Sequence, residues 1–587
     1  MTRVQDQAHA HAAAPSSPAV EIGAMPDTRS VNFYETDHYL RFLLHRRLAA
    51  DELALAEPRL IELGARLGGE LEDLAAAADK TTPTLVVRDK RGERVDEVVP
   101  SRAYRELERI LYGEYGMAAM SLRSGVLAAD GPSSLVANDA FIYLATQAES
   151  GLFCPLSMTR ALARTLLKYA PQDVIDRYVS NLLSTDLEAL YTGAMFMTEK
   201  QGGSDLGLTA STARPSSERD GWWELVGEKW FCSNVGADLM LTLARPEGAG
   251  PGTRGLGLFL VPRHLPDGAC NRYRIERLKD KLGMRSFASG EVTFDGTYAL
   301  LIGGPGEGWL QMTEMLNITR LGCAGAAGAL SRRSFLESLV HARGRVAFGR
   351  TLAELPLMRE QLLDMQMDVE ALTALFFEGS AQLDAADHGD AEAKILARVL
   401  TPLAKYHVSD EARRVVAEGM EVRGGNAYIE DWPNARLLRD VHVQALWEGT
   451  GNISALDVGR AIAREGAGEA LLRNLDARLA AIDDPAVTRV AMLARRELGR
   501  VGAVLRQMAE AQPAARELRV KRLTRQLAHA VSAALLVEDA GVQAREEGSY
   551  RCLTQAAHYL RHYVFPPRDG MAAEVEALAL DAFDAMV

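Results

Sequence analysis

The sequence contains no run of apolar residues long enough to cross a membrane. A spanning helix requires about 18 to 20 such residues. The first thirty residues also lack the basic start and apolar core of a secretory signal, and they are rich in Ala, Pro, Ser and His. We therefore predict a disordered tail over residues 1–30, no membrane span and a cytoplasmic protein.

Cysteine is scarce. The five cysteines lie far apart and form no CxxC pair. This spacing argues against a zinc site and against a disulfide framework, and it suits a reducing compartment. We therefore expect no bound metal.

Common nucleotide-binding and hydrolase motifs are missing as well. There is no G-x-G-x-x-G after a strand, and "GGPGEGW" fails at its last position. G-x-x-x-x-G-K-[ST], H-E-x-x-H and G-x-S-x-G are also absent. Any nucleotide cofactor must be held in another way. The net charge of −13 further excludes a generic nucleic-acid binder.

The hydrophobic pattern divides the 587 residues into distinct regions. Residues 31–190 read as helical, whereas residues 191–310 carry short alternating pieces such as "WWELVGEKWFCSN" between Gly- and Pro-rich turns, which is typical of a β-domain. Helix returns over residues 311–465, and a further helical domain covers residues 466–587. The predicted class is α+β, mostly α, without the βαβ units of a parallel sheet.

The helix expected after residue 360 shows this periodicity clearly. Its apolar residues recur at steps of three and four and predict one buried stripe: Leu362, Met365, Val369, Leu372 and Phe376.

Two stretches near the predicted β-domain carry possible chemistry. In "MFMTEKQGGSD" two glycines would let backbone N–H groups approach an anion, and Ser204 could donate to a phosphate, although an ordinary loop is an equal alternative. In "GEKWFCSN" we expect Trp230 and Phe231 to point to opposite faces of a strand, so that only one lines a site.

Two more stretches lie in the helical regions. "HARGRVAFGR" is expected to put Arg345 and Phe348 one helical turn apart, which suits a phosphate and a stacked base, although a surface helix end is the commoner explanation. "ALWEGTGNISALD" sets Glu448 between Trp447 and a glycine. A lone glutamate of this kind is usually a solvated charge or a helix-start residue.

Taken in order, these stretches resemble the acyl-CoA dehydrogenase family over about residues 150–465. The extra domain after residue 465 resembles the AidB-like (adaptive response) branch. So do the residues of five motifs: "CPLSMT", "MTEKQGGSD", "VPRHLPDG", "RLKDKLGMRS" and "WEGTGNI". The resemblance implies an N-terminal helical domain, a middle β-barrel-like domain, a C-terminal helical bundle with the cofactor and the catalytic base, and an extra C-terminal helical domain.

The resemblance implies FAD as the cofactor. In family members the matching positions hold the flavin and its pyrophosphate within one protomer: Met197, Thr198, Ser204, Phe231, Ser233, Thr450 and Asn452. Arg345, Phe348 and the strip from Glu421 to Gly425 match residues that reach the adenosine part from a neighbouring protomer, which implies a homotetramer. Many relatives have glutamine where this chain has Pro356 and Glu421, so contacts of these two residues with the FAD of a neighbouring protomer stay an open question.

The resemblance also implies a reaction. Glu448 matches the base that removes the α-proton of an acyl-CoA thioester while a hydride leaves for flavin N5, and Arg320 matches an arginine that supports the base's loop. A helix-surface charge is an equal alternative for Arg320. The electron acceptor is either an electron-transfer flavoprotein or oxygen.

Three other functions remain open. A nitroalkane oxidase would share the fold but is expected to use Asp as its base, against which Glu448 argues. A flavoprotein that only binds is possible. The main rival is double-stranded DNA binding, as the AidB-like resemblance implies, through a basic stripe: Arg516, Arg519, Arg522 and Arg525. Residues 466–587 hold equal numbers of basic and acidic side chains, and a solvated or intersubunit face is the simpler explanation of the stripe.

Overall fold

The computed structural model describes residues 25–566, 580 and 582–587. Residues 1–24 of the predicted tail lie outside this part of the chain. Residues 28 and 29 are held against the helices, because the Thr28 hydroxyl donates to Glu337 at 2.6 Å and Arg29 pairs with Asp73 at 2.6 Å.

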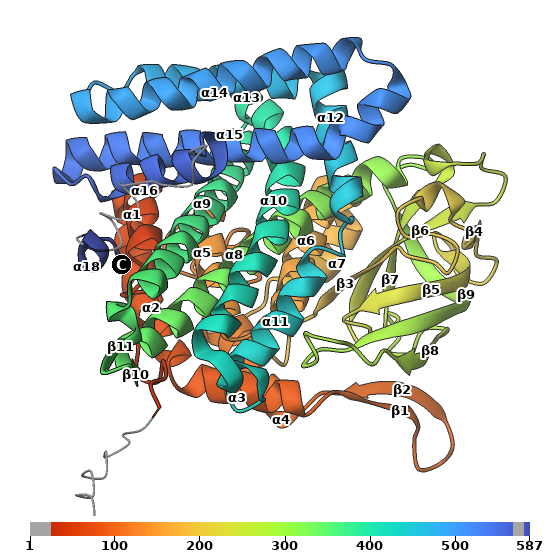
Figure 1. The fold of residues 1–587 in the computed structure, drawn as a ribbon. Helices are drawn as coiled ribbons and strands as arrows, with labels where there is room; N and C mark the ends of the chain where they lie inside the picture. The colour runs from red at the N-terminus through yellow and green to blue at the C-terminus, as the bar shows by residue number, and fades with distance from the viewer. Residues whose placement is uncertain (1–24, 567–579, 581) are drawn as a thin grey trace, which may run out of the picture.

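The first region is a layer of helices (Figure 1). Asp37, Ser101 and Ser134 accept hydrogen bonds from main-chain N–H groups of the first turn and so begin three of these helices. The helices are α1 (His38–Arg47), α2 (Ala50–Leu67), α3 (Glu70–Lys80), α4 (Arg102–Glu108), α5 (Leu135–Thr146), α6 (Phe153–Tyr169) and α7 (Gln172–Leu182).

A hairpin interrupts this helical region, where the pattern had predicted helix throughout. Strands β1 (Thr84–Arg88) and β2 (Arg94–Val99) pair antiparallel and extend towards the β-domain (Figure 1). An isolated hairpin is marginally stable in water. Here Arg94 donates to the Ile275 carbonyl at 3.0 Å, and the Val98 side chain packs against Gly236. Tertiary contact therefore stabilises strands that a local pattern does not reveal.

The predicted β-domain is confirmed as a closed set of strands. Strand β6 pairs with both β4 and β7, and the ring runs β6-β4-β5-β9-β7, with β3 beside β6 and β8 beside β9. A buried Lys229–Glu199 pair at 2.7 Å crosses its interior. The strands are β3 (Gly193–Phe196), β4 (Thr212–Pro215), β5 (Trp223–Ser233), β6 (Leu239–Pro246), β7 (Gly257–Pro262), β8 (Tyr273–Leu278) and β9 (Ser289–Ile302).

Five helices follow and form a bundle. They are α8 (Gly308–Gly344), α9 (Pro356–Asp387), α10 (Ala391–Arg423), α11 (Pro433–Gln444) and α12 (Gly451–Glu465). The predicted stripe of α9 is buried from Leu362 to Phe376. The fold class, α+β and mostly α, is thereby confirmed.

The last helices lie across one end of this bundle (Figure 1). Gly466, at φ +65°, separates α12 from α13 (Ala467–Ala480). The remaining elements are α14 (Pro485–Glu510), α15 (Pro513–Glu547), α16 (Arg551–Tyr559), the π-helical turn η6 (Leu560–Val564) and α18 (Phe583–Met586). Among the described residues no helix combines the length and apolarity that a bilayer crossing needs.

Candidate active site

Glu448 lies in the short loop between α11 and α12. Its backbone is left-handed, with φ +54°, and the next residue, Gly449, has φ +102°. A residue with a side chain adopts this conformation at a cost of about 1–3 kcal/mol, and such residues cluster at functional sites. The main-chain N–H of Glu448 makes no hydrogen bond within the described residues. The strained loop therefore presents both an acid and a free donor.

Two cations hold the main chain of this loop. Arg320, on α8, donates through Nε to the Glu448 carbonyl at 2.9 Å and pairs through Nη1 with Asp457 on α12 at 2.7 Å. Lys405, on α10, donates to the Gly449 carbonyl at 2.5 Å, and burial lowers the pKa of its amine to about 8. Three helices therefore fix the position of the acid.

The carboxyl group of Glu448 is buried and only partly satisfied. Its Oε2 atom has no accessible surface and no hydrogen-bond partner among the described residues, while the nearby Thr319 hydroxyl, which donates to the Met315 carbonyl at 3.2 Å, slightly opposes the rise in the pKa of the carboxyl. Burial raises the pKa of Glu448 above its ordinary value, and Arg320 and Lys405 only partly oppose this shift. An acid with a raised pKa and a free oxygen is suited to accept a proton near neutral pH.

Ser233, predicted to lie near the flavin, is brought close to this acid. It ends strand β5, and its hydroxyl lies near the thiol of Cys154 on α6. The negative charge of Glu448 acts on the same thiol, and burial raises the pKa of Cys154, so the thiol stays protonated. The β-domain, α6 and the Glu448 loop therefore meet at one place.

The other predicted residues of the β-domain lie at the start of its first loop. Met197 and Thr198 follow β3 and are half-buried, and Ser204 is exposed. The Thr198 carbonyl accepts a hydrogen bond from the Trp230 N–H at 2.8 Å. A Cβ on Gly203 would lie 3.2 Å from the Thr198 side chain, so a larger residue would push that side chain aside by a few tenths of an ångström.

Phe231 is more open than a core residue, with 56% of its surface exposed. The expected alternation of Trp230 and Phe231 is interrupted, because the register of β5 shifts between Lys229 and Cys232. The Lys279 ammonium lies over both rings, 3.5 Å from the Trp230 centroid and 4.8 Å from that of Phe231. The two aromatics therefore share one cation instead of being separated by the strand.

Arg345 and Phe348 do not lie on a helix, which corrects the prediction of a shared helical turn. Helix α8 ends at Gly344, and residues 346–351 form a small hairpin, β10 (Val346–Ala347) and β11 (Arg350–Thr351). Phe348 and Gly349 both have positive φ, which is the type I′ turn that such hairpins favour. Phe348 lies at the tip of this turn and is 92% exposed, which is unusual for a large apolar residue.

The strip from Glu421 to Gly425 lies at the same end of the bundle. Arg423, at the end of α10, pairs with Glu337 near the end of α8 at 2.5 Å. Glu421, Gly424 and Gly425 are exposed, and no atom lies within 4 Å of the Cβ position of either glycine. This end of the protein therefore offers bare backbone beside the exposed Phe348.

Thr450 and Asn452 lie at the N-terminus of α12. Both are exposed, and Thr450 is the N-cap residue without a side-chain capping bond. Lys521, on α15, reaches to within 3.8 Å of the Cβ position of Gly451. A helix N-terminus with free N–H groups and a nearby ammonium favours an anion.

The predicted basic stripe on α15 is only partly free. Arg516 donates to the Ala511 carbonyl at 3.0 Å, and Arg525 pairs with Asp410 on α10 at 3.0 Å. Arg519 and Arg522 are exposed and have no ion-pair partner among the described residues.

Sequence reasoning missed Thr319, Lys405, Asp457 and Cys154. Asp457 falls within the "ALWEGTGNISALD" stretch, and Thr319 precedes Arg320, so both carried a positional signal. Lys405 lies 44 positions from its partner Gly449, a separation that no local pattern reveals.

We expect Arg320→Ala to lower kcat by about 10²-fold, because Arg320 holds the loop of the candidate base Glu448 and a small displacement of a catalytic group is costly. Loss of the positive charge should raise the pKa of Glu448 further, so the acid limb of the kcat–pH profile should move to higher pH. Arg398→Ala is the matched control, since Arg398 also pairs with Asp457, at 2.8 Å, without a bond to the loop. Equal kcat and pH profiles in the two variants would contradict a positioning role for Arg320.

Three family patterns match this chain. The "Adaptive response protein AidB N-terminal domain" matches residues 24–189, the "Acyl-CoA dehydrogenase, middle domain" matches residues 194–297, and the "Acyl-CoA dehydrogenase, C-terminal domain" matches residues 306–463.

Similar proteins agree with these matches. The AidB protein of Escherichia coli is 38% identical over 418 residues, which cover 69% of this chain and 74% of that protein. The structure of ACDH-11 from Caenorhabditis elegans in complex with C11-CoA has a TM-score of 0.85 at 27% identity and covers 97% of this chain and 95% of that one. An acyl-CoA dehydrogenase of Bacillus anthracis complexed with FAD shares the fold, with a TM-score of 0.71 at 17% identity, and covers 92% of this chain and 88% of that one. The chain therefore belongs to the acyl-CoA dehydrogenase family, oxidoreductases that act on CH–CH groups with FAD as their cofactor, and it carries the AidB type of N-terminal domain.

Proposed function

We propose that this protein catalyses the α,β-dehydrogenation of an acyl-CoA thioester with Glu448 as the base. One observation carries the proposal: the buried Oε2 of Glu448 has no partner within the described residues, on a strained loop held by Arg320 and Lys405. A structural glutamate would have its oxygens satisfied, whereas a base must keep one free for the incoming proton.

The residues around this carboxyl fit a flavin. Phe231 offers an exposed ring, Ser204 and Thr450 offer exposed hydroxyls, and the start of α12 offers N–H groups to a pyrophosphate. We propose that these residues, with Met197, Thr198, Ser233 and Asn452, hold FAD. Bound FAD would supply the acceptor for the hydride that leaves the β-carbon.

The protein's own groups do the rest. Glu448 takes the α-proton, and its unpaired main-chain N–H is suited to receive the thioester carbonyl, where negative charge develops. Cys154 and Thr319 line the base with weakly polar groups and limit its contact with water. This dry setting keeps the base strong.

The direct test is anaerobic titration of the purified yellow protein with a panel of acyl-CoAs. We expect at least one of them to bleach the flavin absorption. The panel should include chains near eleven carbons, because the similar C. elegans protein was solved with C11-CoA. A flavin that no thioester reduces would contradict the proposal. Once a thioester has reduced the flavin, its reoxidation by an electron-transfer flavoprotein or by oxygen would identify the electron acceptor.

We also propose a homotetramer in which Arg345, Phe348 and the strip from Glu421 to Gly425 reach the FAD of a neighbouring protomer. The support is the 92% exposed Phe348 beside two uncovered glycines at the same end of the bundle. An aromatic side chain this exposed is stabilised when another molecule covers it.

Phe348→Ala is expected to weaken FAD retention at least about tenfold and to shift the protein to smaller assemblies, since burial of an aromatic ring stabilises by about 1.5–3 kcal/mol. Analytical ultracentrifugation and the FAD content after gel filtration measure both effects. The matched control is Leu518→Ala, at an exposed apolar residue on α15, which is 81% exposed. Equal behaviour of the two variants would remove Phe348 from the assembly.

A second candidate function is binding of double-stranded DNA through α15. Exposed Arg519, Lys521 and Arg522 favour it. Arg516 and Arg525 already bond to other groups, so fewer basic side chains of the stripe are free to contact phosphates. Phosphate contacts make affinity fall steeply with salt. Absence of salt-dependent affinity for a DNA duplex would exclude this function.

We further propose a cytoplasmic location, which suits the five free thiols.

A further inference from the structure

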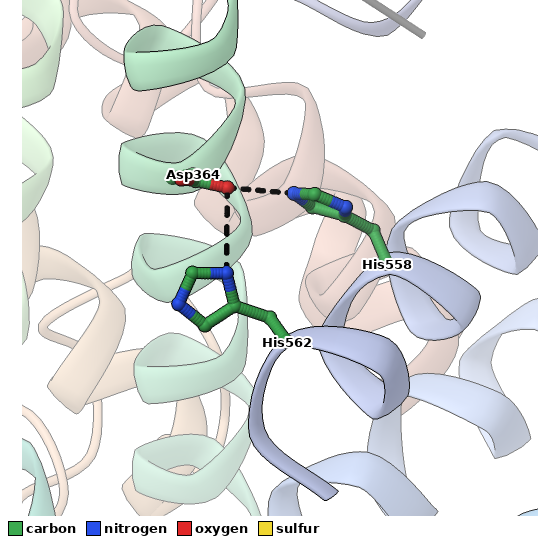
Figure 2. A group of neighbouring side chains, drawn as sticks. All are labelled: Asp364, His558 and His562. Atoms are coloured by element: carbon green, nitrogen blue, oxygen red, sulfur yellow. Dashed lines mark hydrogen bonds and ion pairs between the residues drawn. The ribbon is translucent and has the colours of Figure 1, made fainter. Parts of the chain in front are cut away.

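Three side chains from two distant parts of the chain converge between α9 and α16 (Figure 2). Asp364 lies on α9, His558 on α16 and His562 on the π-helical turn η6. The Oδ1 atom of Asp364 lies 2.7 Å from His558 Nε2 and 3.7 Å from His562 Nδ1. All three ligand atoms lie within 4.8 Å of one another.

The spacing of the two histidines suits a shared ligand site, because side chains four positions apart lie on the same face of a helix. Helix α16 gives way to η6 at Leu560, between the two histidines, which are four positions apart. A π-helical turn is rare and is frequently found at functional sites. Figure 2 shows both imidazoles directed at the same carboxylate oxygen.

The cluster is closed on one side and open on the other. The His558 side chain is 4% exposed, that of Asp364 25% and that of His562 41%. A cation could therefore enter from solvent, coordinate the buried imidazole of His558 and keep a water molecule as its fourth ligand.

Two imidazole nitrogens and one carboxylate oxygen are ligands that suit zinc-class cations, whereas magnesium and calcium prefer oxygen. Metal–ligand distances of about 2.0–2.2 Å separate tetrahedral ligands by about 3.4 Å. The observed 2.7 and 3.7 Å lie on either side of this separation, so small side-chain rotations would complete the geometry.

A second group of possible ligands, His407, Glu411 and His529, is already satisfied. Arg414 donates to Glu411 at 3.3 Å, the His529 ring stacks on Tyr563 at 4.5 Å, and His529 Nδ1 bonds to the Tyr559 hydroxyl at 2.8 Å. This group is an aromatic and ionic contact between α10 and α15.

We propose that Asp364, His558 and His562 bind one zinc-class divalent cation, which fastens α16 and η6 to α9 of the bundle. The site is separate from Glu448 and independent of the proposed reaction. The scarcity of cysteine had led us to expect no metal. Because 194 positions separate Asp364 from His558, sequence spacing could not reveal these ligands. A cation that binds only the folded chain stabilises it by mass action.

The test uses the full-length, untagged protein after removal of metals with a chelator. Calorimetric titration with Zn²⁺ is expected to show one equivalent per chain, and Zn²⁺ is expected to raise the unfolding temperature. His562→Ala, at the more exposed ligand, should weaken binding at least tenfold, and Asp364→Asn should do the same. Mg²⁺ at equal concentration should not compete.

The matched control is His45→Ala, because His45 pairs with a carboxylate, Glu57, at 3.2 Å but has no second histidine. It should leave the stoichiometry and affinity unchanged. His9 and His11 stay in every variant, so any binding to them is common background. Absence of Zn²⁺ binding, or binding that His562→Ala leaves unchanged, would overturn the proposal.

Discussion

Glu448→Gln is expected to lower kcat by about 10²–10⁴-fold, the contribution typical of a general base. Glutamine keeps the size of the side chain and can still accept hydrogen bonds through its amide oxygen. It cannot accept a proton from carbon. The loss should therefore appear in turnover and in flavin bleaching, while FAD remains bound.

The stability of this variant separates catalysis from folding. Burial raises the pKa of Glu448, so the ionised carboxyl is less favourable in the folded chain than in the unfolded one. Stability from this group therefore falls as pH rises from its unfolded pKa towards its folded pKa, and removal of the charge is neutral or stabilising at neutral pH. We expect an unfolding midpoint no lower than that of the parent.

The pH dependence of the parent enzyme has the same origin. Only ionised Glu448 can act as a base, so kcat should rise with pH through a value above the ordinary glutamate range of about 4.3. Glu517→Gln, at an exposed glutamate on α15, is the control and should leave the profile unchanged. Turnover of Glu448→Gln within a few-fold of the parent would refute its assignment as the base.

Glu378→Gln is expected to destabilise the protein by about 3–5 kcal/mol, the usual cost of removing one partner from a buried ion pair. The Glu378 carboxylate is 1% exposed and bonds to Arg47 at 2.9 Å and to Arg478 at 2.7 Å. It thereby connects α1, α9 and α13. Without its charge, the largely buried Arg47 would lose its ion-pair partner, and Arg478 would keep only Glu538.

The measurement is urea unfolding followed by far-UV circular dichroism. Midpoints are the quantity to compare, because a multidomain chain need not unfold in two states. Glu360→Gln is the matched control, at an exposed position on the same helix. Equal midpoints for the two variants would show that the Glu378 network does not hold the domains together.

The arginines hold the pKa of Glu378 well below its ordinary value. Its stabilising contribution is therefore complete above the unfolded pKa and is lost only as pH falls towards the folded pKa. The difference between parent and variant should stay constant over pH 6–9 and shrink only in strong acid.

Local pattern was enough to predict several features. The period of the α9 stripe, from Leu362 to Phe376, reflects which face of a helix must leave water, and that face is buried. The alternating pieces over residues 191–310 likewise predicted the β-domain, because strands expose alternate residues to the core. The short motifs were sufficient to indicate the family.

Other features depend on residues that meet only in the fold. The β1–β2 hairpin was predicted as helix, since its contacts with Gly236 and Ile275 lie far away in the sequence. The helical turn expected for Arg345 and Phe348 proved to be a hairpin, because Phe348 and Gly349 adopt positive φ.

The sequence by itself determined the family and the class of fold, since each depends on local periodicity or on motifs of neighbouring residues, and it indicated the acid that we propose as the base. Only the tertiary structure decided what makes that acid usable. Thr319, Arg320 and Lys405 come from helices far from Glu448 in sequence. The two cations hold its loop, and burial raises the pKa of its carboxyl group against the opposing effect of all three. The cluster of Asp364, His558 and His562 is likewise visible only in the tertiary structure. Electrostatics and metal ligation depend on distance in space, which sequence separation does not encode.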